Sequence, residues 1–140
     1  RASAAPHCPG SLDLPGYGEV HIIPNGWADD APPPVANIAG WDIVAPMDSR
    51  AYFGDACNAG VYSNEDYLAL NLLGKTMKYS ANVHGAGCGC NAAMYLVSMR
   101  QNTEKSTCGD YYCDANSVCG IPCAEIDIQE ANMYAWHSTL

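Results

Sequence analysis

The chain has 140 residues, of which 49% are hydrophobic and 15% are charged, so it is long enough for one folded domain with its own core. Acidic residues outnumber lysine and arginine 15 to 6, and the resulting formal charge of −9 argues against nucleic acid or an anionic membrane as a partner. No apolar run reaches the length of a membrane-spanning helix.

The chain contains an even number of irregularly spaced cysteines: Cys8, Cys57, Cys88, Cys90, Cys108, Cys113, Cys119 and Cys123. This pattern predicts a framework of four disulfides made in an oxidising compartment. The pairs Cys88–Cys90 and Cys119–Cys123 are also conceivable zinc ligands, although neither has a familiar zinc-site spacing. Residues 1–6 are mostly small, as at a terminus left by processing, and together with the cysteines they predict a secreted protein.

Residues 1–36 are rich in glycine and proline and predict a loop-rich N-terminal segment. Within it, residues 19–23 are a short strand candidate, and Ala31–Pro34 is expected to be extended and unable to join the interior of a sheet. We expect residues 37–140 to hold the strands of the same single domain. The whole chain, 1–140, is then one β-rich domain.

Strand-like segments recur through the middle of the chain. The candidates are residues 38–44, 51–53, 60–62, 75–83 and 92–99, the last being the strongest. Periodicity does not decide whether residues 67–73 are a helical turn or a buried strand. Residues 100–122 predict a long loop that needs disulfides to stay ordered. Many short strands, closely spaced turns and little helical periodicity predict an all-β sandwich.

The most informative stretch is residues 125–132, with the sequence Glu-Ile-Asp-Ile-Gln-Glu-Ala-Asn. Strand alternation places Glu125 and Asp127 on one face, about 6.6 Å apart along an ideal strand. Like charges on one face repel, so this pair is better explained by chemistry that uses two carboxyl groups in different protonation states. Glu130 is an odd step from Glu125, and we expect a β-bulge between Ile128 and Glu130 to return it to the same face.

These carboxylates predict glycoside hydrolysis with retention, in which two carboxyl groups lie roughly 5–5.5 Å apart. Glu125 would be the nucleophile and Glu130 the acid/base, while Asp127 shares a proton or hydrogen bond with Glu125 and tunes its pKa. The alternatives are a solvated acidic strand and a calcium-binding run, against which the two isoleucines favour a regular strand. This chemistry needs no metal and no cofactor.

Four motifs in one order resemble the family 7 glycoside hydrolases. They are Leu-Leu-Gly-Lys-Thr-Met-Lys-Tyr-Ser-Ala-Asn-Val (residues 72–83), Cys-Gly-Cys-Asn-Ala-Ala-Met-Tyr-Leu-Val-Ser-Met (88–99), Tyr-Cys-Asp-Ala (112–115) and the acidic stretch. Together they cover about residues 68–132. The chain differs from the family at Cys90, where an apolar residue is usual, and at Gln129, where an aromatic is usual. The loop between Tyr112 and Glu125 is also shorter.

The resemblance implies a concanavalin A-like β-sandwich (a jelly roll), a β-1,4-glucan substrate such as cellulose, and retention of configuration. It implies Glu125 as nucleophile, Asp127 as its partner and Glu130 as acid/base. The expected substrate-binding residues are Asn91, Tyr95, Asp114, Asn132 and His137. The related laminarinase-like enzymes share the fold, so a β-1,3-glucan is the nearest alternative substrate.

Members of this family continue well beyond the acidic strand, so the resemblance leads us to expect that this chain holds only the front part of the sandwich. Its last strand would expose an unpaired edge, and we expect a second protein chain that completes the sandwich, or a homo-oligomer. The main alternative to a secreted β-glucanase is a non-catalytic carbohydrate-binding or structural extracellular protein that retains the fold. A disulfide-rich subunit of an extracellular assembly is a third hypothesis.

Overall fold

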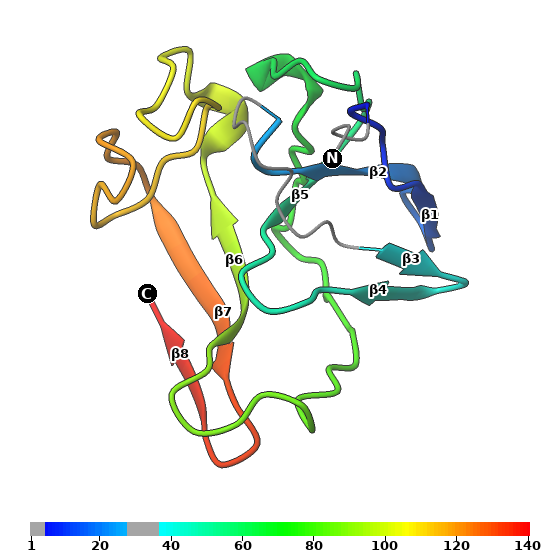
Figure 1. Cartoon of the computed structure of the whole chain (residues 1–140), viewed down its shortest axis with the longest axis vertical. Helices are drawn as coiled ribbons and strands as arrows, with labels where there is room; N and C mark the ends of the chain where they lie inside the picture. The colour runs from blue at the N-terminus through cyan, green and yellow to red at the C-terminus, as the bar shows by residue number, and fades with distance from the viewer. Residues whose placement is uncertain (1–4, 28–36) are drawn as a thin grey trace. The chain divides into compact units, whose positions relative to one another are not determined.

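The structure is a computed structural model that describes residues 5–27 and 37–140, so the predictions for residues 1–4 and Ala31–Pro34 lie outside the described part (Figure 1). The chain forms two compact units: unit 1 is Arg1–Ala69 with Met99–Tyr112, and unit 2 is Leu70–Ser98 with Cys113–Leu140. All described strand pairs are antiparallel, and helix within residues 5–27 and 37–140 is limited to two single 3-10 turns. The predicted all-β class is confirmed, and the sheets are consistent with part of a β-sandwich.

The main sheet of unit 1 has the order β1-β2-β5, formed by β1 (Ser11–Leu14), β2 (Gly18–Pro24) and β5 (Ala51–Gly54). The central strand β2 supplies the buried Val20, Ile22 and Ile23, which confirms the strand predicted at 19–23. Strand β1 lies where a loop was predicted, because a tight turn folds residues 11–14 back onto β2 with Leu12 opposite Val20. Gly16 makes that turn possible with a φ of 82°.

The predicted strand over residues 38–44 is instead a hairpin of β3 (Asn37–Ala39) and β4 (Asp42–Val44). Gly40, with a φ of 66°, reverses the chain in its middle. The strand predicted at 60–62 is wrong, since Val61 closes a turn by donating its N–H to the Asn58 carbonyl. Two 3-10 turns, η1 (Asn64–Asp66) and η2 (Met99–Gln101), also belong to unit 1.

A buried carboxylate, Asp110, joins the strands of unit 1 to the loop after η2. Its side chain is fully buried, with Arg50 Nη2 at 3.7 Å from Oδ2. Four donors reach its two oxygens: Asn25 Nδ2 at 3.0 Å, Tyr52 OH at 2.5 Å, Ser106 Oγ at 2.8 Å and the Tyr112 N–H at 2.9 Å. The loop of residues 102–112 is thereby fixed to Asn25, which directly follows β2, and to Tyr52 of β5 through one acceptor group.

Unit 2 is built on a three-stranded sheet with the order β6-β7-β8: β6 (Ala92–Val97), β7 (Glu125–Ala131) and β8 (Trp136–Thr139). The strands predicted at 92–99 and at the acidic stretch are confirmed as β6 and β7. Strand β8 had no clear sequence signal and forms as the return arm of a hairpin. Asn132 shapes the connection, since its Oδ1 accepts the N–H groups of Tyr134 and Ala135.

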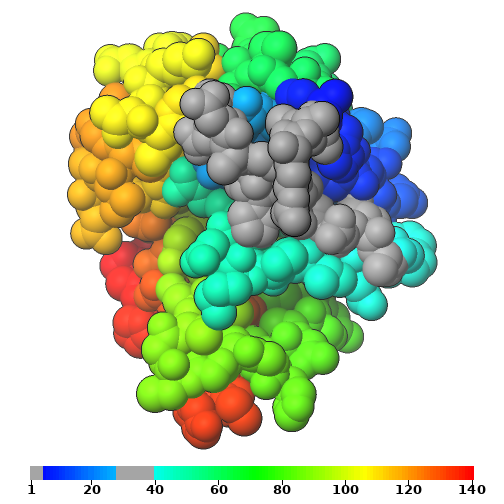
Figure 2. Space-filling view, viewed as in Figure 1, coloured from blue at the N-terminus to red at the C-terminus, as the bar shows by residue number. Residues whose placement is uncertain are grey.

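Residues 70–91 form no strand, so the prediction at 75–83 is wrong. Most of these residues are exposed, and Figure 2 shows much of this green segment at the surface. No strand lies beside it within the described part of the chain, and an isolated extended segment has no ladder of hydrogen bonds to hold it. The segment 67–73, left open between helix and strand, is neither, although Tyr67 makes an isolated bridge to Gly54.

The structure has three disulfides, not the four that the cysteine count predicted. Cys8 bonds to Cys57 and Cys113 bonds to Cys123, and two further cysteines, Cys108 and Cys119, are also disulfide-bonded. Cys88 and Cys90 are free thiols, the first exposed and the second half-buried. With the other six cysteines already oxidised, these two have only each other as a partner within the chain.

Candidate active site

The acidic strand β7 is the middle strand of its sheet and contains the predicted bulge. Tyr95 of β6 lies opposite Asp127, but the preceding Met94 lies opposite Gln129, so Ile128 has no partner in β6. The other neighbour, β8, shows the same irregularity between Asp127 and Glu130. The bulge is therefore confirmed, with Ile128 as its extra residue.

The bulge decides which face of the sheet carries Glu130. Before Ile128, Glu125 and Asp127 share a face; after it, the alternation is shifted by one residue. Gln129 and Ala131 are buried on the opposite face, while Glu130 is half-buried and contacts Tyr95, the residue opposite Asp127. All three carboxylates are consequently brought to one face of β7.

Glu130 lies among three polar side chains. Its Oε1 accepts hydrogen bonds from Asn91 Nδ2 at 3.1 Å and from Tyr95 OH at 3.2 Å. Its Oε2 is 3.5 Å from Nδ1 of His137, the residue opposite Glu130 on β8, and this contact is an ion pair when the imidazole is protonated. Burial, followed by the charge of Glu130, raises the pKa of Tyr95 to about 12, so Tyr95 remains a hydrogen-bond donor at neutral pH.

Glu125 has a different environment at the other end of the acidic row. Its Oε2 accepts the backbone N–H of Ala115 at 3.0 Å. Partial burial raises the pKa of Glu125; the Ala115 hydrogen bond opposes this shift, and the negative charges of Asp127 and Asp114 add to it. A hydrogen bond with Asp127 acts in the same direction as the burial. The two glutamates therefore differ in their partners: Glu125 accepts from a backbone N–H, whereas Glu130 is surrounded by side chains.

Asp127 lies between the two glutamates and has an oxygen available. Its Oδ1 is buried and has no hydrogen-bond partner among the described residues. An unpaired buried carboxylate oxygen is costly, on the order of 1–3 kcal/mol or more. Such an atom is suited to accept a hydrogen bond from a ligand hydroxyl.

Three of the five predicted substrate-binding residues, Asn91, Tyr95 and His137, lie around Glu130. The other two hold the chain in place. Asp114 is buried, and its Oδ1 accepts the Val118 N–H at 3.0 Å. Asn132 shapes the β7–β8 hairpin and donates to the Cys90 carbonyl at 3.3 Å. Whether any of the five contacts substrate stays a prediction.

Sequence reasoning missed two contributors to the site. The Ala115 N–H is a backbone donor, and a backbone group leaves no side-chain signature; the only indication was a short cysteine-bounded loop directly before the acidic strand. Gln129 was noted only as a departure from a family pattern, yet it is buried and donates from Nε2 to the Ala92 carbonyl at 2.9 Å. It thereby ties β7 to the start of β6.

The described residues contain no group of three or more histidine, cysteine, aspartate or glutamate side chains arranged to hold a metal ion. Among the same residues, no helix is both long and apolar enough to cross a bilayer.

Three curated fungal endoglucanases are similar to this chain in sequence. Endoglucanase type C of Fusarium oxysporum is 32% identical over 97 residues, which are 54% of this chain and 23% of that protein. Endo-β-1,4-glucanase celB of Emericella nidulans is 32% identical over 109 residues, covering 64% and 25%. Endoglucanase 1 of Pyricularia oryzae is 32% identical over 114 residues, covering 67% and 25%.

The chain thus spans about a quarter of the length of these curated relatives. No family model matches it, and no solved structure matches it significantly.

Proposed function

We propose that the chain carries the catalytic strand of a secreted, retaining β-glycoside hydrolase of family 7 that acts on a β-1,4-glucan. The observation that carries the proposal is the row of three carboxylates that the Ile128 bulge brings to one face of β7. The similarity to three fungal endoglucanases supports the substrate class. Six of the cysteines are disulfide-bonded, and this supports secretion because disulfides form and persist in oxidising compartments.

In this mechanism Glu125 attacks the anomeric carbon while Glu130 donates a proton to the leaving glycosidic oxygen. The C–O bond of the glycoside breaks and a glycosyl ester with Glu125 forms. Glu130, now a carboxylate, then removes a proton from water, and the resulting attack releases the sugar with its original configuration and regenerates Glu125.

The neighbours of the two glutamates have distinct roles in the proposal. Tyr95 and Asn91 orient the Glu130 carboxyl group through its Oε1, and His137 faces its other oxygen. Asp127 offers its unpaired Oδ1 to a sugar hydroxyl and modulates the charge of Glu125. These contacts hold both catalytic groups in fixed rotamers, which reduces the entropy lost on reaching the transition state.

The partner part of the proposal rests on the open edge of β8. One side of β8 pairs with β7, while the other side has no strand within the described residues. Trp136 and Ile126 are exposed apolar side chains on the sheet face opposite the acids. We infer that a second protein chain, or another copy of this one, adds strands at this edge and covers that face.

Substitution of each glutamate tests the function. Glu125→Gln should abolish hydrolysis of cello-oligosaccharides, and Glu130→Gln should abolish it for natural substrates while sparing substrates with a good leaving group. Glu104→Gln, at an exposed position, is the matched control. The first product should be the β-anomer by NMR, and parallel assays on β-1,3-linked oligosaccharides separate the two linkages. Wild-type activity in Glu125→Gln would refute the catalytic assignment.

A non-catalytic glucan-binding protein is the second candidate. Exposed Tyr134 and Trp136 at the β7–β8 hairpin favour it, since aromatic rings stack on sugar rings. Calorimetry with cellohexaose distinguishes it: binding that Trp136→Ala weakens, without any hydrolysis by the wild-type chain, would support binding alone.

A further inference from the structure

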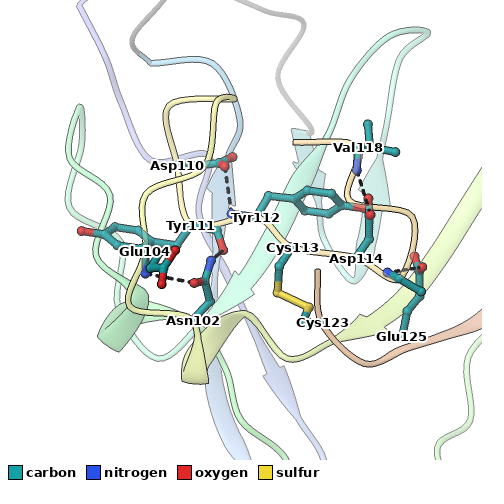
Figure 3. Close-up of a disulfide and its surroundings, with 11 residues drawn as sticks. Asn102, Glu104, Asp110, Tyr111, Tyr112, Cys113, Asp114, Val118, Cys123 and Glu125 are labelled. Carbon is teal, nitrogen blue, oxygen red and sulfur yellow. Dashed lines mark hydrogen bonds between the residues drawn. A yellow bond between two sulfur atoms is a disulfide. The ribbon is translucent and has the colours of Figure 1, made fainter. Parts of the chain in front are cut away.

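The loop of residues 113–123 immediately precedes β7 and is fixed at both ends. The Cys113–Cys123 disulfide closes it across a sequence separation of 10 residues (Figure 3). Inside it, the Asp114 carbonyl accepts the N–H groups of Cys123 at 3.0 Å and Ser117 at 3.3 Å. The Asp114 Oδ1 accepts the Val118 N–H at 3.0 Å. These bonds leave little freedom to the backbone that follows Asp114.

The residue that follows Asp114 is Ala115, whose backbone N–H donates to Glu125 Oε2 at 3.0 Å. The bond from the Ser117 N–H to the Asp114 carbonyl makes residues 114–117 a β-turn, with Ala115 at its second position. The direction of the Ala115 N–H is therefore set by the turn, and the turn is set by the disulfide-closed loop.

The Ala115 N–H shifts the pKa of Glu125 in the direction opposite to burial and the neighbouring acids. Burial and the neighbouring charges of Asp127, on the same strand, and Asp114, on the loop, all raise the pKa of Glu125. The Ala115 N–H lowers it, because a hydrogen bond to the charged form stabilises that form. A nucleophilic carboxylate must be ionised, so this one bond favours the reactive state.

We propose that residues 113–123, closed by the Cys113–Cys123 disulfide, form a positioning device that presents the Ala115 N–H to Glu125 and holds its side chain as an oriented carboxylate. This inference rests on the proposed function, in which Glu125 is the nucleophile. Ala115 is a positioning residue, since it acts through Glu125. The effect of the device on the ionisation of Glu125 can be measured without any substrate.

Ala115→Pro is the most direct test. Proline has no N–H and is favoured at the second position of a β-turn, so the change removes the donor with little disturbance of the loop. Ala115→Ser keeps the N–H and is the matched control. The pKa of Glu125, followed by carboxyl carbon NMR, should rise in Ala115→Pro and stay unchanged in Ala115→Ser. An unchanged pKa in Ala115→Pro, or an equal rise in both, would overturn the proposal.

Removal of the Cys113–Cys123 disulfide tests how much it contributes to the position of the Ala115 N–H. In the double variant Cys113→Ala/Cys123→Ala, the Ala115 amide should exchange faster with solvent and the pKa of Glu125 should rise. Cys8→Ala/Cys57→Ala removes the disulfide of unit 1 and should change neither quantity. If the Cys113–Cys123 variant leaves both quantities unchanged, the disulfide has no role. If that variant does not fold, Ala115→Pro alone decides.

Kinetics separate this inference from the proposed function. With an active chain, Ala115→Pro should lower kcat about tenfold, as expected for the loss of a charge-assisted hydrogen bond, and should move the acidic limb of the kcat profile to higher pH. A shifted Glu125 pKa in a chain that hydrolyses no glucan would refute the proposed function and support the loop. Glucan hydrolysis by the wild-type chain, with an unchanged Glu125 pKa in Ala115→Pro, would support the proposed function and refute the role of the loop.

Discussion

Replacement of Asp110 by alanine removes the single acceptor group of the buried network in unit 1. Four donors converge on this carboxylate from Asn25, Tyr52, Ser106 and the backbone of Tyr112. Since the Asp110 side chain is fully buried, water does not replace it without opening the core.

The magnitude follows from the donors left without this acceptor. At about 1 kcal/mol for each of four donors, the free energy of unfolding should fall by about 4 kcal/mol, within the range of about 3–5 kcal/mol for breaking a buried ionic contact. Tyr52→Phe removes one donor and should cost about 1 kcal/mol. Asp13→Ala, an exposed aspartate on β1, is the control and should change stability by less than about 0.5 kcal/mol.

Urea unfolding with disulfides intact measures these changes, and amide exchange at Ile22 and Ile23 of β2 reports on unit 1 specifically. The two readouts are needed because a chain of two units need not unfold in one step. If Asp110→Ala behaves like Asp13→Ala, the network does not stabilise unit 1 and the reasoning from buried donors is wrong.

Three further predictions concern unit 2. The pKa of Glu125 is raised in the folded state, so its contribution to folding stability is present at low pH and is lost as pH rises through that pKa. Glu125→Gln should therefore stabilise the chain at about pH 7 and by much less at about pH 3. An equal change in the free energy of unfolding at both pH values would contradict this. Tyr95→Phe removes an O–H donor from Glu130 and should lower kcat/KM by about tenfold, whereas an unchanged value would show that Tyr95 does not orient the acid/base. Alkylation of the unreduced chain should label Cys88 and Cys90 alone by peptide mass mapping, and failure to label them would indicate a fourth disulfide.

The local sequence was sufficient to predict β7, β6 and the bulge. Alternation of acids and isoleucines fixes a strand, and the odd step from Glu125 to Glu130 requires one extra residue if the acids share a face. The predictions failed where a strand depends on a partner. Residues 75–83 alternate like a strand but have none beside them in the described part, and the short β8 forms because the hairpin returns it to β7.

The sequence by itself determined the all-β class, the carboxylate row and the presence of a disulfide framework. Composition, strand alternation and cysteine count can all be obtained from the sequence without knowledge of any tertiary contact. Tertiary structure alone decided which groups surround each acid. His137 meets Glu130 because β8 pairs with β7 in one register, and Ala115, which meets Glu125, lies in a loop closed by the Cys113–Cys123 disulfide. Contacts between residues distant in the chain depend on register and loop closure, and neither is encoded in any single stretch.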